Sequence, residues 1–165
     1  RLAEVSEKLL ARFRKKTLEE STGIDIYDIP KEGKERQAII TQRVNQNFFR
    51  EMVLSLYKNK CCITGLGIPR LLIAGHIKPW SLDKENRMNP HNGIVLNALH
   101  DKAFEAGLIT ILTDYTIRLS SELKKKNDSL KSFFQKYEGQ KIFLPPSRQP
   151  SKTLLEYHND VRFLK

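Results

Sequence analysis

Three of the four histidines in this 165-residue chain lie in one stretch of sequence, residues 61–110: His76, His91 and His100. Histidine is the side chain that acts as a base near neutral pH or binds a metal ion through a neutral ring nitrogen. The same stretch supplies amide and carboxylate groups that can orient an imidazole or bind a cation: Asn92, Asp101 and Glu105. This combination predicts a metal-assisted hydrolase site.

The elements that position these side chains follow in the order strand, loop, strand and helix. Their predicted ranges are 71–77, 78–92, 93–96 and 98–106. The first strand is an apolar run that contains His76, and the loop is rich in Pro and Asn without any periodicity. Asn97 is expected to cap the helix, and Gly107 is expected to end it. His100 and Asp101 would then lie on the helix.

Helices are expected on both sides of this stretch. The predicted helices cover residues 2–20, 34–58, 121–139 and 153–163, with a loop at 21–33, a short strand at 61–64 and a hairpin of 108–112 with 116–120. In the second helix an apolar stripe is predicted to face inward: Ile40, Val44, Phe48, Met52 and Leu56. Its opposite face carries Arg43, Arg50 and Lys58. His91 is expected in an exposed loop, and His158 is expected at the surface.

The chain carries a net charge of +10, and most of the excess lies in residues 1–60 and 113–165. Such a charge favours a polyanionic partner, because cationic side chains release the counterions condensed on phosphates. The alternative is a surface that is merely basic. Cys61 and Cys62 are adjacent, so they predict neither a disulfide framework nor structural zinc. With no apolar run long enough for a membrane span and no signal peptide, a cytoplasmic location is expected.

The motifs from Cys61 to His100 resemble the HNH nuclease family, in particular its restriction-endonuclease-like branch. The matching elements are Cys61/Cys62 to Gly65, Ala74 to Trp80, Asn92–Gly93 and His100. The resemblance implies an α+β fold with a ββα-metal (His-Me finger) core surrounded by helices. It divides the chain into an N-terminal helical region at 1–60, the nuclease core at 61–112, and a C-terminal hairpin and helical region at 113–165.

The resemblance also implies roles for individual residues. His76 would be the general base, Asn92 would hold it, and His100 would bind the metal with Asp101 as the better candidate for a second ligand. Many family members have an Asp directly before the base, but this chain has Gly75 there, which leaves the second ligand open. Few protein ligands and several waters suit Mg²⁺, with Mn²⁺ as a substitute. The structural alternatives are that His76 and His100 are core histidines without a role in chemistry, and that Asn92 is only a turn residue.

Lys78 and Arg87 lie in the loop between the two strands and are candidates for binding phosphates. Arg87 belongs to the segment RMNPHNG, which resembles the family pattern Arg-x-x-Pro-x-Asn-Gly. Arg87 could equally be a structural clamp on the loop, and Lys78 could serve only solubility.

These observations predict a metal-dependent endonuclease that hydrolyses DNA, with bacterial restriction or defence as the implied setting. Three alternatives remain: a catalytically inactive ββα module that binds nucleic acid, a nuclease for RNA or structured DNA, and a protein-interaction domain with an incidental metal site. Because the chain begins with Arg, it is expected to be a fragment, and a recognition domain is expected outside it. Cleavage of both strands would call for a homodimer.

Overall fold

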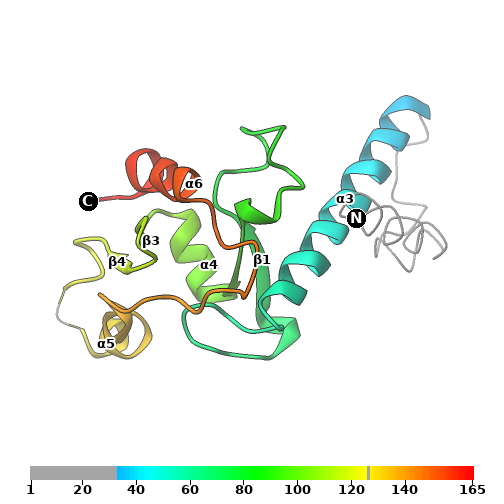
Figure 1. Ribbon diagram of the computed structural model, residues 1–165. Coiled ribbons are helices and arrows are strands. Elements are labelled where there is room, and N and C mark those ends of the chain that lie inside the picture. Colours follow the sequence, from blue (N-terminus) through cyan, green and yellow to red (C-terminus); the bar gives the residue numbers. More distant parts are fainter. Residues whose placement is uncertain (1–32, 126) are drawn as a thin grey trace. The chain divides into compact units, whose positions relative to one another are not determined.

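The computed structural model describes residues 33–125 and 127–165 (Figure 1). The predicted helix at 2–20 and most of the loop at 21–33 lie outside the described residues. The chain divides into two compact units, residues 1–51 and 52–165, and the site described below lies in the second. Among the described residues, no helix combines the length and the apolar composition needed to cross a membrane.

Two antiparallel strands form the centre of the second unit. Strand β1 spans Leu72–His76 and strand β2 spans Gly93–Asn97, with His76 opposite Gly93 in the register. A 3₁₀ turn, Pro90–Asn92, leads into β2. The middle of β2 is completely buried, so neighbouring elements cover both of its faces. Both predicted strands are confirmed.

Helix α4, Ala98–Glu105, follows β2 without a loop. The Asn97 side chain caps it, because its Oδ1 accepts a hydrogen bond from the His100 main-chain nitrogen at 3.0 Å. The chain leaves the helix through Gly107, whose φ of +72° is unfavourable for residues with a Cβ. The cap and the stop are those predicted from the sequence. Figure 1 shows α4 beside β1 and β3.

A second antiparallel pair, β3 (Ile109–Ile111) and β4 (Ile117–Leu119), confirms the predicted hairpin. The small sheets and the helices together agree with the predicted α+β class. Residues 61–64 were predicted as a strand, but they form a turn. Only Cys62 makes strand-like contacts there: its N–H donates to the Val95 carbonyl at 2.8 Å, and its carbonyl accepts from Phe143 N–H at 2.7 Å. A 3₁₀ turn at Pro69–Leu71 then leads into β1.

Helix α3 spans Gly33–Leu56, close to the predicted range of 34–58, but its inward stripe was predicted wrongly. The buried residues at its C-terminal end and just beyond it are Phe48, Phe49, Val53, Leu54 and Tyr57. They lie mostly one position later than the predicted stripe, in which only Phe48 is buried among the side chains described. Apolar residues occupy both adjacent rows of the helix here, so periodicity alone does not choose between them. Arg43 is exposed as predicted.

The predicted helix at 121–139 is also wrong in its extent. Turns occupy 121–125, helix α5 spans Asp128–Phe133, and a 3₁₀ turn follows at Gln135–Tyr137. Asn127 caps α5 through its Oδ1, which accepts from Ser129 N–H at 2.9 Å. An Asn side chain that can start a new helix competes with continuation of an earlier one. Phe133, at the end of α5, is 54% exposed.

The C-terminal segment packs against the end of α4. Helix α6, Lys152–Tyr157, continues into a π-helical turn, His158–Arg162. Beyond it, Leu164 N–H donates to the Gly107 carbonyl at 2.9 Å. The contact is so close that a Cβ on Gly107 would collide with the Arg162 carbonyl oxygen. Gly107 therefore ends α4 and also allows the C-terminal segment to approach it.

We predict that Gly107→Ala lowers the free energy of unfolding more than Gly139→Ala does. Both glycines have positive φ, +72° and +76°, so each substitution costs about 1 kcal/mol from backbone strain. A Cβ on Gly139 would meet nothing within 4 Å, whereas one on Gly107 would meet Arg162. Urea unfolding of the two variants measures the difference. Equal losses would contradict the close approach.

Candidate active site

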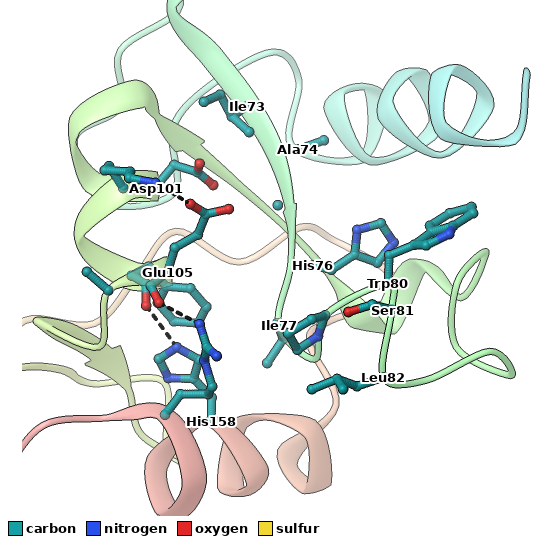
Figure 2. Close-up of a pocket in the computed structure, with 16 residues that line it drawn as sticks. Ile73, Ala74, His76, Ile77, Trp80, Ser81, Leu82, Asp101, Glu105 and His158 are labelled. Atoms are coloured by element: carbon teal, nitrogen blue, oxygen red, sulfur yellow. Dashed lines mark hydrogen bonds and ion pairs between the residues drawn. The ribbon is translucent and has the colours of Figure 1, made fainter. Parts of the chain in front are cut away.

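A cavity of about 760 Å³ opens at the end of β1 (Figure 2). Strand β1, the loop after it, one face of α4 and the C-terminal turn form its walls. Its polar and titratable lining residues are His76, Ser81, Asp101, Lys102, Glu105, His158 and Arg162. Figure 2 shows Asp101 and Glu105 on the α4 side of β1, while His76 is turned toward Trp80. The cavity thus combines a histidine at a strand end with two carboxylates from one helix.

The His76 imidazole is fixed by the loop that follows β1. Its Nε2 lies 2.9 Å from the Arg87 main-chain oxygen, and its ring meets the edge of Trp80 at 5.5 Å between centroids. A carbonyl oxygen only accepts, so Nε2 carries the proton, and the lone pair of the neutral ring is on Nδ1. Burial lowers the pKa of His76 below its usual value, against the opposing effect of the Arg87 carbonyl. His76 is therefore neutral near pH 7 and chemically suited to accept a proton.

Asn92 fastens this loop to β1. Its side chain is completely buried, and its Oδ1 accepts from Lys78 N–H at 2.8 Å. Its Nδ2 donates to the carbonyls of Lys78 and Asn86 at 3.0 and 3.2 Å. Its main-chain oxygen accepts from Ile77 N–H at 2.9 Å. All of these bonds go to main chain, so Asn92 shapes the loop that presents the Arg87 carbonyl to His76.

Neither Lys78 nor Arg87 extends its side chain into the cavity. Arg87 Nε donates to the Trp80 carbonyl at 2.9 Å, and its guanidinium lies 5.1 Å from the Trp80 ring centroid. Lys78 Nζ pairs with Asp83 at 3.2 Å and lies 5.0 Å from the Tyr157 ring centroid. These contacts favour the structural alternative for Arg87, a clamp on the loop. Neither predicted phosphate-binding side chain lines the cavity that contains His76.

Asp101 faces β1 at the position of Gly75. A Cβ built on Gly75 would lie only 2.7 Å from Asp101 Oδ1, so the carboxylate occupies space that any side chain at position 75 would take. Burial and the nearby Glu105 carboxylate raise the pKa of Asp101 to about 6, and Lys102 partly offsets them. Among the described residues, none donates a hydrogen bond to this carboxylate. Asp101 is thus a buried acid whose charge is offset only in part by Lys102 and, in the part of the chain described, by no hydrogen-bond donor.

Glu105 lies one helical turn after Asp101 and lines the same cavity. Its Oε2 pairs with Lys102 Nζ at 3.1 Å on the exposed side of the helix. Two neighbouring carboxylates, one of them buried and unpaired, form a set of hard oxygen donors that suits a divalent cation with several waters. The described residues contain no group of three or more His, Cys, Asp or Glu side chains that could hold a metal ion. From these residues a resident cation would therefore draw no more than two such ligands.

His100 lies outside the cavity, which corrects the predicted grouping of His100 with Asp101. Consecutive helical residues point about 100° apart, so the two side chains face different neighbours. The His100 ring is buried against Phe134 and Tyr137, with centroids 5.2 and 5.5 Å away. Its Nδ1 lies 3.0 Å from Asn97 Oδ1, and its buried Nε2 has no hydrogen-bond partner among the described residues. Aromatic surroundings without a second ligand do not fit a metal ion.

His158 was predicted at the surface, and that prediction is wrong. Its ring is 2% exposed and stacks on Phe104 at 3.6 Å between centroids. Its Nε2 donates to the Phe104 carbonyl at 3.1 Å, and its Nδ1 lies 2.8 Å from Thr110 Oγ1. These partners lie about fifty residues away in the chain, so no local pattern pointed to them. His91 is exposed as predicted.

Comparison with known proteins agrees with the location of this cavity. Residues 61–112 match a family model described as HNH endonuclease. The match includes β1, β2, α4 and β3, and every cavity residue except His158 and Arg162. No curated protein matches the chain. The family match indicates a nuclease, and HNH domains generally use a divalent metal ion.

The buried His158 predicts acid sensitivity of the fold. Burial lowers its pKa from 6.5 to about 4. The unfolded chain therefore takes up a proton first, so the stabilisation is complete above about pH 6.5 and is lost as the pH falls toward 4. The shift corresponds to about 3 kcal/mol. His158→Gln should flatten the fall of unfolding free energy with acid in this window. Urea unfolding at several pH values measures the slope.

The parent protein is the reference in this experiment, because the other titrating groups are common to both chains. The raised pKa of Asp101 acts in the opposite direction over part of the window and cancels in the comparison. Parallel slopes in the two proteins would contradict a neutral, buried His158.

Proposed function

We propose that this chain, whose residues 61–112 belong to the HNH endonuclease family, is a metal-dependent endonuclease that hydrolyses DNA phosphodiester bonds. The observation that carries the proposal is the cavity at the end of β1. There the family segment presents a neutral histidine and two acidic side chains. We assign the ββα-metal core of the family to β1, β2 and α4.

His76 is the general base in this proposal. Hydrolysis needs a water molecule that loses a proton as it attacks phosphorus, and the Nδ1 lone pair of His76 can accept that proton. The positive charge then formed on the ring is stabilised by the Arg87 carbonyl, to which Nε2–H already donates. Asn92 is a positioning residue, because its amide holds the loop that carries this carbonyl.

Asp101 and Glu105 are the residues that would hold the divalent cation, Mg²⁺ or Mn²⁺ in its place. When bound, the ion supplies positive charge to the phosphate oxygens in the transition state. A cation would also relieve the repulsion that contributes to the raised pKa of Asp101. The predicted ligand His100 is left out of this proposal, because its ring packs among aromatic side chains on another face of α4.

This arrangement of the metal ligands accounts for a glycine at position 75. The family often has an Asp at this position, directly before the base histidine. Here the missing side chain leaves room for the Asp101 carboxylate to reach the β1 backbone. The carboxylate from α4 therefore stands close to where the absent one would be. A glycine in place of the family's Asp therefore still leaves a carboxylate, that of Asp101, at this point of the cavity.

The substrate and setting rest on charge and family. A net charge of +10 favours a nucleic acid over a neutral substrate, and the resemblance to restriction-like HNH nucleases favours bacterial defence in the cytoplasm. A homodimer would allow cleavage of both strands. A recognition domain outside this chain would provide sequence or modification specificity, because backbone contacts position a protein without reading bases.

A nucleic-acid-binding module without catalysis is the second candidate. The presence of only two carboxylates in the cavity, with no third ligand among the described residues, favours it. The two candidates differ in cleavage: a binding module binds DNA but does not cleave it, whichever divalent metal ion is present.

The proposed activity predicts that the parent protein nicks or cuts supercoiled plasmid in Mg²⁺ or Mn²⁺ and is inactive in EDTA. His76→Ala should lose at least about 100-fold in rate, the range expected for loss of a general base. The assay includes unmodified DNA, modified DNA and RNA. Binding to DNA by both proteins, without cleavage by the parent on any substrate, would support the binding module instead.

A second prediction concerns Gly75→Ala. The added methyl group would displace Asp101 Oδ1, which it would approach to 2.7 Å. Because the displaced atom ends a side chain that can rotate, the fold should lose little stability. A misplaced ligand, however, should slow cleavage about 10- to 100-fold. Gly67→Ala is the matched control, since its Cβ would make an ordinary contact at 3.5 Å. Equal activity in both variants would argue against Asp101 in the site.

A further inference from the structure

Arg162 lines the same cavity as His76, Asp101 and Glu105. It is the last residue of the π-helical turn His158–Arg162 and lies fifty residues beyond the end of the HNH-matched segment, at residue 112. The family match therefore assigns it no role. π-Helical turns are rare and occur often at functional sites.

The backbone that carries Arg162 is held firmly against α4. Gly107 has no side chain that would keep the Arg162 carbonyl away, and its own carbonyl accepts from Leu164 N–H at 2.9 Å. On the other side of the turn, the buried His158 ring stacks on Phe104. The turn is thus fixed at both ends to the C-terminal half of α4.

The guanidinium itself is placed by a main-chain contact. Arg162 Nη2 donates to the Glu105 carbonyl at 2.8 Å, at the end of α4. This bond uses one of five N–H donors, and the side chain remains exposed. The other donors can meet a ligand in the cavity without breaking the contact that positions the group.

Arg162 differs from the other charged residues that line the cavity, because its charge is not paired with an acidic side chain of the described residues. Asp101 and Glu105 are acidic, and Lys102 is already paired with Glu105. Arg162 forms no ion pair with an acidic side chain among the described residues. A phosphate that approaches two carboxylates needs positive charge nearby, and a guanidinium can bind it with two parallel hydrogen bonds.

We propose that Arg162 binds a backbone phosphate of the DNA in this cavity, so that the C-terminal turn completes the cleavage site. This inference rests on the proposed function, because it places a polyanionic substrate at His76. It differs from the sequence prediction, which gave phosphate binding to Lys78 and Arg87. Those two side chains are held by Asp83 and by Trp80, respectively.

The test is the salt dependence of binding to a duplex oligonucleotide, measured by fluorescence anisotropy in EDTA so that no cleavage occurs. For one lost phosphate contact, the slope of log K against log salt concentration should fall by about 0.9 in Arg162→Gln. Lys152→Gln removes the same charge from an exposed site on α6 outside the cavity and should change the slope less. Thermal unfolding checks that both variants fold.

Arg162→Lys extends the test to geometry. It keeps the charge, so most of the slope should remain, but it cannot form the paired hydrogen bonds, and cleavage should slow at least about 10-fold. A slope in Arg162→Gln equal to that in Lys152→Gln would overturn the inference and leave only a structural contact to Glu105. A parent protein that binds DNA but cleaves no substrate would overturn the proposed catalysis. The salt-dependence slopes would still test whether Arg162 contacts a phosphate. Absence of DNA binding by the parent would overturn both.

Discussion

The site depends on how closely α4 packs on β1. At Gly75 the helix approaches so near that the Asp101 carboxylate fills the space of a side chain. This orientation turns Asp101 and Glu105 toward the cavity, and it turns His100 toward aromatic side chains instead. The same helix receives the C-terminal turn at its far end through Gly107. One packing arrangement therefore decides which side chains of α4 can take part in chemistry.

The loop after β1 is the second requirement, because it determines the state of the histidine. Asn92 is buried and uses its whole amide to hold the main chain of Lys78 and Asn86. The loop then brings the Arg87 carbonyl to His76 Nε2 and fixes the proton there. A buried amide with all of its hydrogen bonds made is stable, whereas an incomplete one is costly. Asn92 thus links the stability of the loop to the chemistry of the site.

The sequence predicted the parts of the site that depend on local pattern. The strands around His76 and after Asn92, the Asn97 cap and the Gly107 stop all follow from short-range rules. The sequence did not predict which face of α4 turns inward, because that depends on packing between elements. It also missed the burial of His158 and the position of Arg162, which contact α4 across about fifty residues of chain. Periodicity and motifs carry no information on such contacts.

The most direct test of this account is a calorimetric titration of Mn²⁺ into the protein without DNA, at a pH above the Asp101 pKa of about 6. The variants to compare are Asp101→Asn and His100→Gln, with thermal unfolding to confirm that each is folded. The account predicts that Asp101→Asn abolishes metal binding and that His100→Gln retains it. Binding that survives in Asp101→Asn and disappears in His100→Gln would contradict it, and would return the metal to the face of α4 that the sequence first suggested.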